Sequence, residues 1–140
     1  MCLIKAKPVK TEKDITCYKV CYRTYGGTYV SPFMWYNYIP GQLYQVNTNN
    51  PQLGIVDKDG LYIEGNAFHT FKTLQGARQY LKNKYTDYEY VIMKCIIPKE
   101  SEYIYEGIFK IYFWNKFRKF VSYASQQILP VSVIEWSGVK

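Results

Sequence analysis

The chain has 140 residues, which is a usual length for one domain. Hydrophobic residues make up 48% of it and include sixteen Tyr, seven Phe and three Trp, so the chain can fill a core. This composition excludes disorder over the whole chain, a coiled coil and a collagen-like protein. No apolar run is long enough for a transmembrane helix, and the net charge of +7 points to an anionic partner.

The N-terminal quarter combines a basic lead-in with a first strand. Residues 1–13 contain four lysines and no periodicity, so we expect a basic N-terminal arm ahead of one domain over residues 14–140. The run from Asp14 to Arg23 is rich in β-branched and aromatic residues, which predicts a strand. Two glycines after Tyr25 predict a turn, and short apolar runs over 33–39 and 43–46 flank a second turn at Pro40-Gly41.

The middle of the chain predicts a loop, a hairpin and the main helix. Residues 47–52 are polar and break all periodicity, while Asp57 to Gly60 predict a hairpin turn between two short strands. A helix over about residues 71–83 follows, because Leu74, Ala77 and Leu81 recur at helical spacing. Its polar positions are cationic.

The last third predicts strands only. Residues 88–97 are almost continuously apolar and end at Pro98, which is typical of a strand in the middle of a sheet. Residues 108–113 and 118–123 flank a predicted hairpin turn over 114–117. A final strand over 127–136 contains Pro130, which predicts an edge or a bulge. We therefore predict an α+β fold, mostly antiparallel, with one main helix.

The cysteines and the single histidine give little sign of chemistry. Cys2, Cys17, Cys21 and Cys95 follow no secretory signal, so we expect reduced thiols in a cytoplasmic protein. Cys17 and Cys21 would lie about 13 Å apart on a strand, too far for a disulfide. With His69 as the sole histidine, we expect no metal site and no cofactor. The thiols are predicted to be core residues, and His69 a hydrogen-bonded residue at a strand–helix junction.

One cationic block also carries aromatic residues. The charge is +4 in each of the segments 1–23, 72–84 and 110–140, which acidic segments separate. In the last segment, cations alternate with rings at Lys110, Tyr112, Trp114, Lys116, Phe117, Arg118 and Lys119. Surfaces that bind single-stranded nucleic acid stack bases on rings and place cations against phosphates, so this hairpin is the predicted binding surface. The alternative is a solvated sheet face whose lysines protect an edge from pairing.

Motifs for catalysis are missing from the sequence. It contains no nucleophile elbow, zinc-protease motif, P-loop or dinucleotide fingerprint. Three glutamates after Pro98, at positions 100, 102 and 106, are predicted to lie in an exposed loop rather than to act as acid and base. An enzyme is therefore not the first expectation.

Four segments that together span most of the chain carry a family resemblance: the opening MCLIKAKPVK, the central GNAFHTFKTLQGARQYL, the segment KCIIPKESEYIYEGIF and the later YASQQILP. They resemble a family of small uncharacterised proteins of Bacteroides-type bacteria and their phages or mobile elements. The resemblance implies a bacterial cytoplasmic or phage-associated setting and no particular activity.

A second resemblance concerns the order of five segments: CYKVCYR, Ser31-Pro32, AFHTF before the helix, IPKESEY after a central strand, and the final YASQQILPVSVIEW. This order is similar to that of ADP-ribosyltransferase-like domains. In that resemblance Arg23 stands near the early arginine, Ser31 near the serine strand, and Gln126 at the place of the catalytic glutamate, with His69 beside the pocket. Gln126 cannot supply the charge that stabilises an oxocarbenium-like centre. The resemblance implies NAD use, or a shared fold whose chemistry is lost or altered.

Three hypotheses follow. The first is a binding or accessory protein that contacts a protein or an anionic partner such as nucleic acid through the aromatic and basic hairpin. The second is an ADP-ribosyltransferase-like enzyme, or an inactive relative, with Arg23, His69 and Gln126 around its pocket. The third is a structural component of a virion or an assembly, which a symmetric oligomer would mark.

Overall fold

The structure of the protein is a computed structural model. It describes residues 3–24, 26–31, 37–46, 52–56, 60–65, 67–82, 89–113 and 116–137. The side chains of residues 52–56, 60–65, 111–113 and 116–117 lie outside what is described, although their backbone lies within it.

These residues form twelve strands and one helix. In chain order they are β1 (Leu3–Pro8), β2 (Ile15–Arg23), β3 (Tyr29–Val30), β4 (Asn37–Tyr38), β5 (Tyr44–Gln45), β6 (Gln52–Val56), β7 (Gly60–Gly65), β8 (Phe68–Phe71), α1 (Leu74–Lys82), β9 (Tyr90–Ile97), β10 (Ile104–Phe113), β11 (Lys116–Ser125) and β12 (Gln127–Ser137).

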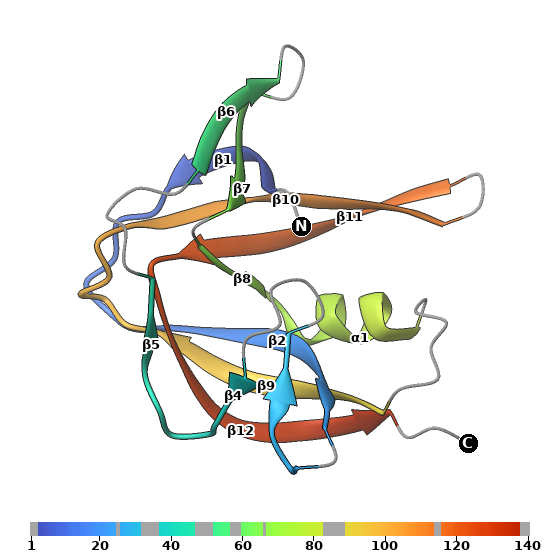
Figure 1. Ribbon diagram of the computed structural model, residues 1–140. Coiled ribbons are helices and arrows are strands. Elements are labelled where there is room, and N and C mark those ends of the chain that lie inside the picture. The colour runs from blue at the N-terminus through green and yellow to red at the C-terminus, as the bar shows by residue number, and fades with distance from the viewer. Residues whose placement is uncertain are drawn as a thin grey trace.

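The strands belong to one sheet that curls into a half-barrel (Figure 1). Its order is β5-β12-β9-β2-β8-β11-β10-β1-β7-β6, and β3 and β4 extend from β2. Every pairing is antiparallel. The predicted α+β class is therefore wrong, because the protein is essentially all-β with one short helix packed on its sheet. The helix is nine residues long and forms no layer of its own.

The sheet consists of two halves that meet at one point. The upper half-sheet in Figure 1 contains β8, β11, β10, β1, β7 and β6, and the lower half-sheet contains β5, β12, β9 and β2. Only Tyr18 and Phe71 pair across the junction between β2 and β8. Beyond this pair the two strands separate, so the half-sheets form a wedge with α1 between them at one end (Figure 1).

The core lies on both faces of the lower half-sheet. On one face, α1 contributes Ala77 and Tyr80 to a cluster that includes Phe71, Phe109 and Phe120. The rings of this cluster contact each other mainly edge to face or at a tilt, with centroids 5.2 to 6.2 Å apart. On the other face, the thiols and apolar side chains of β2 and β9 are covered by residues of β4, β8, β10, β11 and β12.

Several predicted elements are confirmed. The strand over 14–23, the helix, the apolar strand that ends at Ile97 and the hairpin over 108–123 correspond to β2, α1, β9 and β10–β11. The last strand is confirmed as β12, and its register shifts between Pro130 and Ser132, so the predicted irregularity at the proline is present.

The predicted basic N-terminal arm is wrong for Leu3–Pro8. These residues form β1, which pairs with β10 and β7 and so belongs to the sheet.

Candidate functional site

The predicted hairpin surface divides between the two faces of the sheet. Lys110 of β10 pairs in register with Lys119 of β11, and neighbouring residues of a strand point to opposite faces. Arg118 is therefore on the same face as Phe120, which packs in the cluster around α1, while Lys119 is on the opposite face. Both Arg118 and Lys119 are exposed, and Lys110 is half-buried. The predicted cations do not form one group.

The remaining residues of the predicted surface are only partly described. The backbones of Tyr112 and Phe117 pair in register, and Lys116 pairs with Phe113. The side chains of Tyr112, Lys116 and Phe117 and the whole of Trp114 lie outside the described residues. Their contribution to binding stays a prediction.

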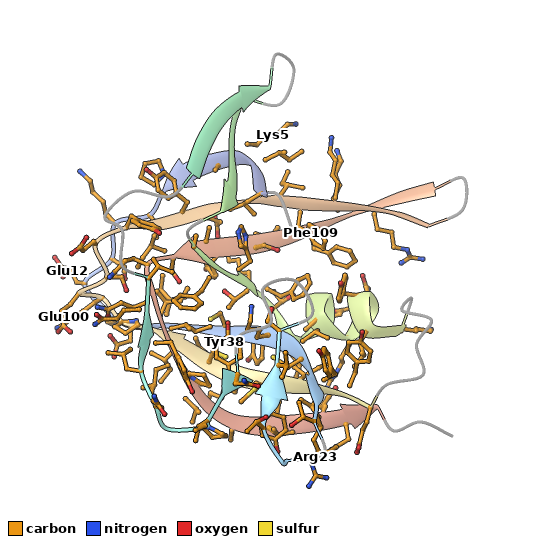
Figure 2. The ribbon with its side chains drawn as sticks, in the orientation of Figure 1. Lys5, Glu12, Arg23, Tyr38, Glu100 and Phe109 are labelled. Atoms are coloured by element: carbon orange, nitrogen blue, oxygen red, sulfur yellow. The ribbon has the colours of Figure 1, made fainter. Side chains whose placement is uncertain are left out.

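The face that carries Lys110 and Lys119 also has an apolar row. Ile4, Ile108 and Val121 pair in sequence across β1, β10 and β11, two residues from the lysine pair. Val121 is 47% exposed, so this row is open to solvent at β11. Lys5 of β1 projects from the upper half-sheet on the side away from α1, whereas Phe109 points toward α1 (Figure 2). We call this surface, made of Lys5, Lys110, Lys119, Ile4, Ile108 and Val121, the basic face.

A carboxylate limits the basic face on its other side. Glu106 pairs in register with Tyr123, and it forms an ion pair with Lys72 at 2.7 Å. This carboxylate is two residues from Ile108 and four from Lys110, so the positive charge is concentrated toward the hairpin tip.

A second polar group is buried at the junction of the half-sheets. Cys17, Lys19 and Cys21 alternate along β2 and share a face, and all three side chains are buried. The Lys19 ammonium donates a hydrogen bond to the carbonyl oxygen of His69 at 2.8 Å. It also lies 5.6 Å from the centre of the Tyr38 ring. The lysine thus occupies the gap that opens where β2 leaves β8.

Burial sets the protonation of this group. It lowers the pKa of Lys19 below the usual range of a lysine and, together with the Lys19 charge, lowers the pKa of His69 to about 3. It also raises the pKa of the Cys17 and Cys21 thiols to about 12 and that of Cys95 well above its usual value. At neutral pH the thiols and the imidazole are therefore uncharged.

Three buried polar atoms here have no hydrogen-bond partner among the described residues. They are both ring nitrogens of His69 and the hydroxyl of Thr70, which lies beside the Cys17 thiol. Sequence reasoning placed His69 in a hydrogen-bonded role and did not identify Lys19 or Thr70. The available signal was the two-residue spacing that puts Lys19 between two cysteines on one strand.

The three residues taken from the transferase resemblance have separate roles in the structure. The Arg23 guanidinium lies 5.3 Å from the Trp136 ring centre at the end of β2, far from Lys5 in Figure 2. His69 is buried in β8, and the side-chain oxygen of Gln126 accepts a hydrogen bond from the Glu102 backbone at 3.1 Å. The hydrogen bonds and cation–ring contacts recorded for the described parts of these residues join no two of the three. Their joint catalytic role stays a prediction.

Three of the four thiols are core residues, as predicted, whereas Cys2 lies outside the described residues. Cys17, Cys21 and Cys95 are buried and free, and Cys17 pairs in register with Cys95. Among the residues that the structure describes, no three His, Cys, Asp or Glu side chains are grouped to hold a metal ion. The described helix is too short and too polar to cross a membrane.

Comparison of the chain with protein-family models, with curated proteins and with solved structures gives no match. The resemblance to small proteins of bacteria and phages therefore stays a prediction, and so does the cytoplasmic setting that it implies.

Proposed function

We propose that this protein acts by binding, and that the basic face of β1, β10 and β11 contacts an anionic partner, with nucleic acid as the candidate class. The observation that carries the proposal is the register of the β10–β11 hairpin, which places Lys110 directly opposite Lys119. Two lysines on opposing strands concentrate positive charge on this face, which favours the approach of an anionic partner.

The apolar row beside the lysines supports the same proposal. Val121 is 47% exposed, although it lies in the middle of a ten-residue strand. An apolar strip next to cations suits a partner that has both an anionic backbone and flat hydrophobic parts, as single-stranded nucleic acid has.

The charge of the chain supports a partner of this sign. A net charge of +7 on 140 residues accelerates the approach of polyanions in general, whereas only the arrangement on one face gives a defined contact. The test must therefore distinguish the effect of where the lysines lie from the effect of the net charge of the protein.

Chromatography on heparin makes that separation. We compare the double variant Lys110→Glu/Lys119→Glu with the control Lys82→Glu/Lys94→Glu, whose exposed lysines lie on α1 and β9. Both variants have the same net charge. The proposal expects the first to elute at clearly lower salt than the control. Equal elution of the two variants would show that only the net charge matters and would refute the proposal.

A further inference from the structure

The buried polar group at the junction of the half-sheets carries an inference that is independent of the basic face. We propose that Lys19, Thr70 and the thiols that face them form a binding site for one small monovalent anion of the size of chloride. The site would lie where β2 separates from β8, between the two half-sheets.

The side chains of this group are mainly hydrogen-bond donors. The Lys19 ammonium can donate three hydrogen bonds, and one of them goes to the His69 carbonyl oxygen at 2.8 Å. The Thr70 hydroxyl is 1% exposed, and its neighbour is the Cys17 sulfur, which is only a weak acceptor. Thiols are weak donors. Apart from the neutral His69 ring, the polar side chains of this buried region are therefore donors, with the Lys19 ammonium and the Thr70 hydroxyl as the stronger ones.

The group also carries a positive charge, on Lys19, without a carboxylate among the titratable groups that face it. The titratable groups that face Lys19 are Cys17 and Cys21 from β2, Cys95 from β9, His69 from β8 and Tyr38 from β4. None of these groups is a carboxylate, and the ion pairs Lys72–Glu106 and Arg78–Glu135 lie elsewhere. Buried charges in proteins are paired, because an isolated ammonium in a core costs several kcal/mol.

A small anion would supply both a hydrogen-bond acceptor and the negative charge that Lys19 lacks among the groups facing it. It would accept hydrogen bonds from the Lys19 ammonium and the Thr70 hydroxyl, and it would neutralise the ammonium within the core. The anion would have to be small, because Cys17, Cys21, Cys95 and Met93 are fully buried close to Lys19. The Tyr38 ring, labelled in Figure 2, lies near the lysine and contributes to its burial.

Thermal unfolding in two salts tests the site. The protein is melted at pH 7 in sodium chloride and in sodium gluconate of equal ionic strength, because gluconate is too large for a buried site. Binding to the folded state alone lowers the unfolding constant by a factor of 1 + [Cl⁻]/Kd, which is about elevenfold at a tenfold excess over Kd. We expect this chloride effect in the wild type and its loss in Lys19→Met.

The matched control is Lys94→Met, which removes one exposed lysine from the neighbouring strand β9. Both variants lose one positive charge, so general screening by salt changes equally. The control should keep the chloride effect of the wild type. An equal chloride effect in wild type and Lys19→Met, or none in the wild type, would overturn the proposal.

Two further measurements apply if Lys19→Met does not fold. Thr70→Val keeps the shape of the side chain and removes one donor, so chloride affinity should fall severalfold. In the wild type, the affinity should also fall about tenfold per pH unit above the pKa of Lys19, since only the ammonium attracts the anion. Chloride stabilisation that persists unchanged in Thr70→Val and up to pH 10 would contradict the site. Heparin elution does not depend on this site, so a failure here leaves the proposed function untouched.

Discussion

The unpartnered imidazole of His69 gives the sharpest expectation about stability. Its side chain is 8% exposed, and neither ring nitrogen has a hydrogen-bond partner among the described residues. Burial and the nearby Lys19 charge lower its pKa from 6.5 to about 3. The folded state therefore holds the neutral ring, while the unfolded chain takes up a proton as the pH falls below 6.5.

The sign and size follow from this difference. A base with a lowered folded-state pKa contributes stability that is present above pH 6.5 and is lost as the pH falls from 6.5 toward 3. At 1.36 kcal/mol per pKa unit, the loss is about 2 kcal/mol between pH 7 and pH 5 and about 4 kcal/mol by pH 3. The range above pH 5 is the informative one, because ordinary carboxylates titrate below it.

Urea unfolding of wild type and His69→Leu from pH 7 to pH 5 measures the effect. We expect the wild type to lose about 2 kcal/mol more than the variant over this range. Because the chain has one histidine, its ring-proton NMR signals can be followed without assignment. A ring that titrates near pH 6.5 in the folded protein would refute the reasoning, even if the variant does not fold.

Three other expectations concern packing and exposure. Thr73→Ala should cost about 1 kcal/mol in urea unfolding, with Thr73→Ser close to wild type, because the Thr73 hydroxyl accepts a hydrogen bond from the Gly76 N–H at 3.0 Å at the start of α1. Gly107→Ala should cost about 1–3 kcal/mol, because a Cβ there would lie 2.6 Å from the Ile4 carbonyl oxygen; Gly76→Ala, whose closest contact is 3.1 Å to a threonine hydroxyl, should not show this loss. The thiols of Cys17, Cys21 and Cys95 should stay unmodified by Ellman's reagent in the folded protein and react after denaturation, since burial keeps them protonated. Rapid reaction of two or more thiols under native conditions would contradict their burial.

The elements with a clear period could be predicted from the sequence. The alternation in β2 and the continuous apolar run of β9 have the patterns of strands, and the helical spacing of Leu74, Ala77 and Leu81 predicts α1. The predicted fold class is wrong because an α+β fold needs helices that form a layer against the sheet. In the described residues, α1 is one short helix that packs on a sheet of twelve strands. Phe68–Phe71 were missed because four residues buried on both faces have no alternation to detect.

The candidate sites depend on register, which the sequence did not determine. The predicted four-residue turn over 114–117 would oppose Lys110 to Val121, but the structure pairs Phe113 with Lys116 and thus Lys110 with Lys119. Lys19 was missed because lysine is rarely buried. Its contact with β8, fifty residues away, exists only once β2 and β8 meet at Tyr18 and Phe71.

The most direct test of the binding proposal is a titration of a fluorescent single-stranded oligonucleotide at several salt concentrations. The logarithm of the association constant falls linearly with the logarithm of salt, with a slope of about 0.7 per phosphate contact. Lys110→Glu/Lys119→Glu should reduce this slope by about 1.4 relative to the control Lys82→Glu/Lys94→Glu, and it should weaken binding at every salt concentration. Equal slopes and affinities in the two variants, or no binding by the wild type at low salt, would contradict the assignment of the basic face to a nucleic acid.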